Sequence, residues 1–304
     1  MIETPMDVLK NHPIRRTRKQ KQAFRAAVQL YLERQGYSVR TEGRGNVKNL
    51  VFGDPETARF LLTAHYDTPA ILWEPHLQMP CNPFWNGLCH VFNALVGLLP
   101  ALAGGVLACI LSRSVYVGAC VLAALVILRP ILMLFGLPNR HNANGNTSGV
   151  VTLLETAASM PRNLRDRVCF VLLDRGEPAM AGSAAHRKAH FPASNCQTVI
   201  DLNCVGDGDT LMLFPGKALR EDVNLLCLAR RCGPKSVAVW QKRSAWVSDH
   251  RNFPRSVGVT ALRQGKLGYR LGRTNTFRDT VLDHTNINIL RACLITYISS
   301  PAAE

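Results

Sequence analysis

The sequence lacks the features that usually mark an exported or redox-active protein. Its ten cysteines are scattered singly, and the two closest, Cys227 and Cys232, do not have the C-x-x-C spacing of a zinc or redox site. The N-terminal residues contain no apolar segment of the kind that forms the centre of a signal peptide. We therefore expect small, buried thiols in a reducing compartment, and no secretion by a cleaved signal.

Acidic residues are also scarce: 21 Asp and Glu stand against 36 Lys and Arg, and the formal net charge is +15. Such an excess suits binding to nucleic acid, binding to anionic lipid, or plain solubility. Basic residues are densest at 15–25, next to a helical pattern of apolar residues at 24, 27, 28, 31 and 32. The predicted helix thus has an apolar face and a basic face, and the basic face is either solvated or in contact with anionic headgroups. Because nucleic-acid motifs and interleaved aromatic and basic residues are missing, no nucleic-acid partner is expected.

Charge is almost absent from residues 88–137. Residues 88–111 carry no formal charge, and a second apolar run at 115–128 is interrupted by Arg129-Pro130 before it resumes at 131–137. About 20 apolar residues span a bilayer, so the first run suffices, and the second does so if Arg129 reaches an interface. We predict an inserted transmembrane helical hairpin. The alternative is a buried helix pair inside a soluble core.

The hairpin divides the chain into three parts. Residues 1–87 and 138–304 form the two parts of one polar domain, and residues 88–137 form the insertion. If both helices cross a membrane, the polar parts lie on the same side. Their excess of Lys and Arg over the single Arg113 in the loop predicts a membrane protein whose polar domain is in the cytoplasm. Membrane lipid is then a partner of the hairpin.

The polar parts alternate between strand-like and helix-like segments. Apolar, β-branched runs predict strands, and one amphipathic run predicts a helix. The strands are expected at residues 49–52, 59–64, 168–173, 198–205 and 259–262, and the helix at 150–158. This alternation predicts an α/β fold with a mixed, mostly parallel sheet flanked by helices, and functional residues at the carboxyl ends of the strands.

Three motifs carry residues suited to chemistry. The predicted strand at residues 59–64 leads into His65-Tyr66-Asp67. The imidazole of His65 can reach a metal there, while the carboxylate of Asp67 orients its ring. Residues 144–149, Asn-Gly-Asn-Thr-Ser-Gly, suit a tight turn that begins a helix. Residues 172–183 form a strand that breaks into a loop containing Glu177. Each motif alone is compatible with ordinary structure.

In this order the motifs resemble the di-zinc aminopeptidase family, known as peptidase family 28 of the metallopeptidases. The motifs of that family run His-x-Asp, then Asp-Asn-x-Ser-Gly, then Glu-Glu-x-Gly-x-x-Gly-Ser. Residues 200–206 resemble its strand ending in a metal-binding Asp, and residues 274–280 resemble the segment with its last histidine ligand. Residues 248–253 resemble its Ser-Asp-His segment, which implies that Asp249 and His250 lie near a substrate pocket.

The resemblance implies a site with two zinc ions that share a bridging carboxylate, and a glutamate base that deprotonates the attacking water. Carried over residue by residue, His65 is the first histidine ligand, Asp67 orients it, and Glu177 is a retained carboxylate ligand. The other required side chains are missing. The positions of the bridging Asp, the general base, the next Asp ligand and the last His ligand hold Gly145, Gly176, Asn203 and Asn275.

Neutral asparagine oxygens are poor zinc ligands and do not offset the charge of two divalent ions, so a tightly bound zinc pair is not expected. The single-zinc site of glutaminyl cyclases also needs acidic and histidine side chains at 145 and 275. We therefore predict a catalytically degenerate, membrane-anchored binding or scaffold module, with a peptide as a further candidate partner.

The alternative is an active metallo-aminopeptidase that removes N-terminal residues of peptides with an altered zinc site. Replacement ligands for such a site would come from Asp201, Asp207, Asp209, Asp249, His250, His141 and His284. In a third arrangement, the side chain of an arginine takes the place of the metal ion. Arg175 and Arg273 flank lost positions and could pair with Glu177.

Overall fold

The computed structural model describes residues 2–191 and 194–300, apart from the side chains of residues 177 and 178. The helices are α1 (Asp7–Asn11), α2 (Arg18–Arg34), α3 (Pro83–Ser112), α4 (Val115–Phe135), α5 (Ser148–Ala158), α6 (Gly176–Ala179), α7 (Ala181–His190), α8 (Val223–Leu226) and α9 (His284–Ser299). The strands are β1 (Val39–Glu42), β2 (Asn49–Phe52), β3 (Phe60–His65), β4 (Val168–Leu173), β5 (Thr198–Leu202), β6 (Thr210–Pro215), β7 (Arg230–Cys232), β8 (Lys235–Val239), β9 (Ser256–Gly265) and β10 (Gly268–Arg270). Short turns of helix are η1 (Ala143–Thr147), η2 (Arg162–Arg167), η3 (Lys217–Leu219) and η4 (Asp249–Asn252).

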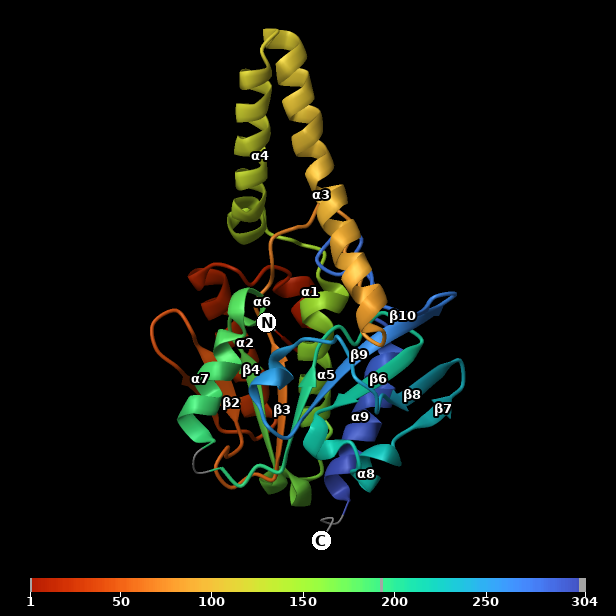
Figure 1. The fold of residues 1–304 in the computed structure, drawn as a ribbon. Coiled ribbons are helices and arrows are strands. Elements are labelled where there is room, and N and C mark those ends of the chain that lie inside the picture. Colours follow the sequence, from red (N-terminus) through yellow and green to blue (C-terminus); the bar gives the residue numbers. More distant parts are fainter. Residues whose placement is uncertain (1, 192–193, 301–304) are drawn as a thin grey trace.

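One mixed sheet forms the centre of the molecule, in the order β1-β2-β4-β3-β5-β9-β6-β8-β7, with β10 paired to β9 (Figure 1). Its central strands β4, β3, β5 and β9 are parallel. Strands β1 and β7 run in the same direction as these four, while β2, β6, β8 and β10 run the opposite way. The predicted α/β fold with a mixed, mostly parallel sheet is confirmed.

Helices cover both faces of this sheet. Alternate residues of a strand point to opposite faces, and on β3 the side chains of Leu62 and Ala64 join a large core with α2, α5 and α9. Leu61 belongs to a smaller cluster on the other face, together with Phe253 after η4 and Phe191 after α7. Side chains of β3 that follow Leu61 at intervals of two residues, including His65, therefore lie on the side of α7 and η4.

The predicted strand at 198–205 ends earlier, at Leu202. Cys204 has a left-handed backbone conformation with φ of 56°, which interrupts an extended strand. Asn203 is therefore the first residue after the strand, although its backbone N–H still donates to the carbonyl of Val259 on β9 at 3.0 Å.

Helices α3 and α4 form a hairpin that projects from the α/β body (Figure 1). Both are long and apolar enough to cross a membrane, and their most apolar windows are only 11% and 6% buried. They are therefore not the core helices of a soluble domain formed by the described residues. The hairpin begins at Pro83, because Asn82 caps the helix and accepts from the backbone N–H groups of Phe84 and Trp85.

The foot of the hairpin is anchored to the body by polar contacts. Asn86 accepts from the backbone of Met79 at 2.8 Å, and Asn93 donates to the carbonyl of Leu77 at 2.9 Å. Arg129 lies 2.5 Å from the carboxylate of Glu74. Helix α4 continues through Arg129 and Pro130 to Phe135. The charge of Arg129 is thus paired with a carboxylate of the body.

Candidate functional site

The carboxyl ends of the parallel strands β3, β4 and β5 meet at one edge of the sheet. The loops that follow them carry Asp67, Gly176 and Asn203, and two further loops bring Gly145 and Asn275 to the same edge. The name edge site is used below for His65, Asp67, Gly145, Gly176, Asn203 and Asn275. The structure thus brings together residues that are far apart in sequence.

His65 and Asp67 lie side by side in the interior. His65 is 5% exposed and Asp67 4% exposed, and His65 Nδ1 is 3.4 Å from Asp67 Oδ1. The amide of Asn146 lies 3.3 Å from the same ring nitrogen and donates to the carbonyl of Asp67 at 2.8 Å. Burial alone would raise the pKa of Asp67, but its contact with His65 and the charge of Lys21 hold this pKa below the ordinary value. The ionised carboxylate fixes the orientation of the imidazole.

Gly176 lies directly against the imidazole ring of His65. Its backbone N–H donates to Asp67 Oδ1 at 2.8 Å. A Cβ atom at Gly176 would lie 2.5 Å from His65 Cγ, closer than any real contact. The ring of His65 therefore occupies the space that a side chain at this position would need. A glutamate could not be placed there unless His65 moved.

Gly145 and Asn275 are joined through the buried carboxylate of Asp279. This carboxylate accepts from the backbone N–H groups of Asn144 at 2.7 Å, Gly145 at 2.9 Å and Asn275 at 3.4 Å. A Cβ at Gly145 would lie 2.9 Å from Asp279 Oδ2 and 3.1 Å from Asn275 Oδ1. Burial raises the pKa of Asp279 to about 7. The space beside Gly145 is therefore bordered by a carboxyl group.

Asn203 is held by its neighbour in sequence. The thiol of Cys204 donates to Asn203 Oδ1 at 3.0 Å and also lies 3.6 Å from the carbonyl of Gly145. The amide oxygen that replaces the carboxylate ligand thus has a donor from within the chain. This contact links the loop after β5 to the loop of Gly145.

Asp249 and His250 lie on η4, on the face of the sheet below His65. Asp249 accepts from the hydroxyl of Ser183, and burial together with the nearby charge of Asp201 raises its pKa to about 7. His250 lies 2.7 Å from the hydroxyl of Ser248, and burial lowers its pKa to about 4. Asp201 accepts from Thr63 at 2.9 Å, while its second oxygen has no hydrogen-bond partner among the described residues. A pair of buried acidic groups therefore lies next to the edge site.

Most of the candidate replacement ligands are engaged or remote. Asp207 lies 2.5 Å from Arg263 and 2.7 Å from Arg273. Asp209 is exposed beside Lys235. Residues His141 and His284 are exposed.

Among the described side chains, three metal-binding donor atoms come within 4.8 Å of one another only at Glu42, His186 and His190, away from the edge site. Arg273 pairs with Asp207. The predicted pairing of Arg175 or Arg273 with Glu177 involves a side chain outside the described part of the chain.

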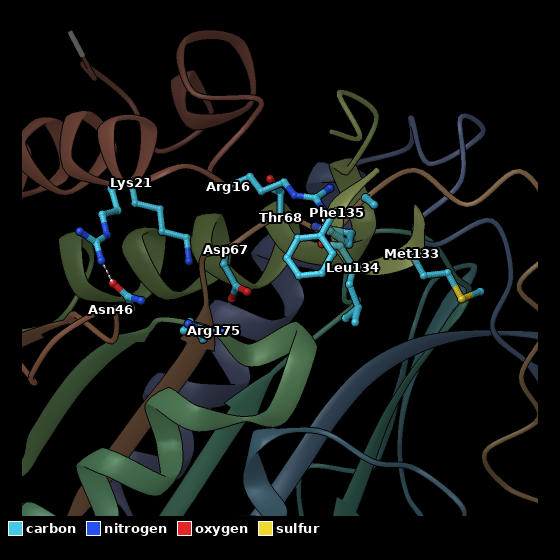
Figure 2. Close-up of a pocket in the computed structure, with 12 residues that line it drawn as sticks. Arg16, Lys21, Asn46, Asp67, Thr68, Met133, Leu134, Phe135 and Arg175 are labelled. Atoms are coloured by element: carbon cyan, nitrogen blue, oxygen red, sulfur yellow. Dashed lines mark hydrogen bonds between the residues drawn. The ribbon is translucent and has the colours of Figure 1, made fainter. Parts of the chain in front are cut away.

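A cavity of about 380 Å³ adjoins the edge site at Asp67 and Thr68 (Figure 2). Its remaining wall is cationic on one side and apolar on the other, where the last turn of α4 closes it. The lining includes Arg16, Arg18, Lys21, Arg175, Met133, Leu134 and Phe135. Figure 2 shows Arg16, Lys21 and Arg175 arranged around Asp67.

The basic segment at residues 15–25 is thus not simply a solvated face. Arg15 is fully buried and donates to the carbonyls of Tyr66 at 2.5 Å and His12 at 2.7 Å. Lys21 lies 2.5 Å from Asp174. Sequence reasoning missed this role of the basic residues. The signal was their helical spacing, because residues 18, 21 and 25 fall on one side of a helix.

The sequence model of Peptidase family M28 matches residues 136–286. Among solved structures, a glutaminyl cyclase from Tannerella forsythia is similar with a TM-score of 0.58 at 15% identity, over 99% of this chain and 98% of that one. The aminopeptidase LapA of Legionella pneumophila is similar with a TM-score of 0.58 at 11% identity, over 97% of this chain and 69% of that one. No curated protein sequence matches the chain significantly. The chain therefore has the fold shared by these aminopeptidases and glutaminyl cyclases, and its residues 136–286 match Peptidase family M28.

Proposed function

We propose that this protein is a membrane-anchored, catalytically inactive M28 protein that acts as a binding or scaffold module. The observation that carries the proposal is the contact between Gly176 and His65. The ring fills the place where the family has its general base, 2.5 Å from a Cβ position. Without a base, the water that attacks a peptide carbonyl has no proton acceptor at this position.

Zinc is typical of M28 proteins, but the edge site does not offer a suitable set of donors. Zinc prefers thiolate, imidazole and carboxylate ligands, whereas two positions here are glycines and two are asparagines. The oxygen of Asn203 is already in contact with Cys204, and the space beside Gly145 is bordered by Asp279. No catalytic step through zinc is derived for this site.

The cationic cavity is the proposed binding site, and its ligand is an acidic peptide. Four basic side chains line it against one acidic residue, Asp67, and the carboxylate of Asp67 is already occupied by Gly176 and His65. The cavity adjoins the edge site at Asp67 and Thr68, and its apolar wall at residues 133–135 suits a hydrophobic side chain.

The binding proposal is tested with fluorescent peptides of equal length and opposite charge, measured on the full-length protein in detergent. We expect binding of the acidic peptide and at least tenfold weaker binding after Arg18→Glu or Arg175→Glu. Arg162→Glu makes the same charge change at an exposed position on η2 and serves as the control. Equal binding of the two peptides, or no effect of the cavity variants, would refute a charge-selective site.

The membrane anchor is proposed from the hairpin. Its helices are apolar, little buried, and long enough to cross a bilayer of about 30 Å at 1.5 Å per residue. The hairpin returns the chain to the same side, and the basic excess outside it favours the cytoplasmic side. Lipid is the proposed partner of the exposed apolar surface.

An active metallo-aminopeptidase with an altered site is the second candidate, favoured by the buried acidic groups below His65. Asp201 has an oxygen without a partner among the described residues and lies close enough to Asp249 to raise its pKa. Asp201→Asn distinguishes the two candidates. If this carboxylate is a metal ligand, the substitution abolishes metal-dependent turnover. Under the leading proposal, neither the wild type nor the variant has turnover.

A further inference from the structure

We propose that Glu42, His186 and His190 form a zinc site that is separate from the edge site. Glu42 is the last residue of β1, and the two histidines lie on α7. None of the three belongs to the motifs that resemble the M28 family. The proposal therefore does not depend on whether the edge site is catalytic.

The two histidines are placed by the geometry of the helix. Residues four apart lie on the same face of an α-helix, so His186 and His190 project together. Their ring centroids are 4.7 Å apart. Glu42 approaches this face from the edge strand of the sheet. Two imidazoles and one carboxylate from two elements are a ligand set that zinc accepts, with a fourth position left for water.

The distances between the donor atoms suit a tetrahedral zinc ion. With bonds of about 2.0–2.1 Å, neighbouring ligand atoms of a tetrahedron lie about 3.3–3.4 Å apart. Glu42 Oε2 is 2.8 Å from His190 Nε2 and 3.6 Å from His186 Nδ1, values on either side of that spacing. The donor atoms of all three residues lie within 4.8 Å of one another. Small side-chain rotations would bring them to bonding distance.

The ring of His186 is the second, independent observation. Its side chain is 0% exposed, and neither of its nitrogens has a hydrogen-bond partner in the described part of the chain. A buried polar group without a partner costs free energy, and native structures rarely retain one without a reason. His190 Nδ1 is also without a partner among the described residues. A metal ion bound to His186 Nδ1 would satisfy one of these buried atoms.

The carboxylate of Glu42 is oriented toward the two histidines. Arg40 donates to Glu42 Oε1 at 2.7 Å, which leaves Oε2 directed at the histidines. A hydrogen bond that orients a ligating carboxylate is usual around zinc.

Zinc at this position would join the edge strand β1 to helix α7. The side chain of His190 is 14% exposed and that of Glu42 19% exposed, so an ion can enter from solvent. The ion would stabilise the fold more as its concentration rises, because it binds the folded chain and the three ligands separate on unfolding. We expect a structural role, since the site joins β1 to α7 and contains none of the edge-site residues.

The test is metal binding by the full-length protein, stripped with a chelator and purified in detergent. Equilibrium dialysis with zinc should give one ion per chain, and cobalt should give the visible absorption of a tetrahedral complex. The melting temperature should rise with zinc and not with magnesium. His190→Ala should abolish these effects, and Glu42→Gln should weaken zinc binding at least tenfold.

Two variants serve as controls. His141→Ala removes an exposed histidine elsewhere, and His65→Ala removes the histidine of the edge site. Both should retain one zinc per chain. Because Glu42→Gln keeps the size of the side chain, it gives a folded variant even if His190→Ala unfolds the protein. Absence of zinc binding, or binding that survives in Glu42→Gln and is lost in His65→Ala, would overturn the proposal.

Discussion

At the scale of single residues, the edge site is stable in its present form because neighbouring groups have taken the space of the absent ones. The ring of His65 lies against Gly176, and Asp279 lies against Gly145. Asp279 is also bonded to three backbone N–H groups from two loops. Restoring one family residue at a time should therefore cost stability.

Gly145→Asp is expected to destabilise the protein. The new carboxylate would begin 2.9 Å from Asp279 Oδ2, and two carboxylates in one buried place repel each other. Gly145→Asn is the matched control, because it has the same size without the charge. At pH 8 the Asp variant should be less stable than the Asn variant by about 1–3 kcal/mol.

The difference in stability between the Asp and Asn variants should narrow at pH 5, since the pKa of Asp279 is about 7 and its carboxyl group is then protonated. Thermal melts of both variants at the two pH values make the comparison. A gap that is independent of pH would show that size, not charge, determines the cost.

Asp249 should make the stability depend on pH. Its pKa is raised to about 7 from an ordinary value of 3.8, so the folded chain binds this proton more tightly than the unfolded chain. Its contribution is fully present below about pH 4 and is lost as the pH rises through 7. Asp249→Asn does not titrate, and its melting temperature relative to the wild type should therefore rise between pH 5 and pH 8.

Asp209→Asn is the control, because it removes the same charge from a side chain that is 62% exposed. Its melting temperature relative to the wild type should change little over the same range. Equal behaviour of the two variants would contradict the buried environment assigned to Asp249.

Much of the edge site was predictable from sequence, because short motifs fix which loops follow which strands. His65, Gly145, Gly176, Asn203 and Asn275 come together as the order of the motifs implies. The part that could not be predicted arises from contacts between distant segments. Arg15 is buried against the loop after β3, and the cavity combines α2 with residues from α4, so neither feature has a local sequence signal.

At the scale of elements, the hairpin depends on close contact between its two helices. A Cβ atom at Gly118 would lie 2.6 Å from Cys109 Cβ and 2.9 Å from the carbonyl of Gly105. Small residues at such a contact are usual where helices pack in a membrane, because dispersion forces and not water hold them together.

Gly118→Leu should force the two helices apart and lower the melting temperature of the protein in detergent by several degrees, about 1–3 kcal/mol of stability. Gly87→Leu is the matched control in the same hairpin, since no described atom lies within 4 Å of its Cβ position. The control should melt like the wild type or slightly higher, because leucine favours helix more than glycine does. An equal loss of melting temperature in the two variants would mean that the helices are not in close contact at Gly118.

The predicted runs at 49–52 and 168–173 match β2 and β4. The buried strand β6 (Thr210–Pro215) was not predicted, and the run at 259–262 covers only part of β9 (Ser256–Gly265). Strands β7 and β10 have only three residues each, too few for a periodic pattern, and they pair with partners near the edge of the sheet. The start of the hairpin was placed at 88 by the absence of charge, whereas the cap at Asn82 begins the helix.

At the scale of the whole molecule, the body and the loop of the hairpin should lie on opposite sides of a membrane. The protein should stay in the membrane after alkaline extraction, since its hairpin is held by apolar contact with lipid. Release into the supernatant would contradict an integral hairpin.

Cysteine labelling reports the orientation. Cys227 is exposed on the body and should react with a membrane-impermeant maleimide only after cells are permeabilised. Ser112→Cys lies at the tip of the hairpin and should react in intact cells. The reverse pattern would place the body outside the cytoplasm, against the excess of basic residues.

The most direct test of the central claim is turnover of N-terminal aminoacyl substrates by the full-length protein, purified in detergent and supplied with zinc. The separate zinc site does not affect this measurement, because His65→Ala alters the edge site alone. We predict no turnover above that of His65→Ala. Zinc-dependent turnover in the wild type that is abolished by His65→Ala would contradict the proposal and show that the edge site is catalytic despite Gly145, Gly176, Asn203 and Asn275.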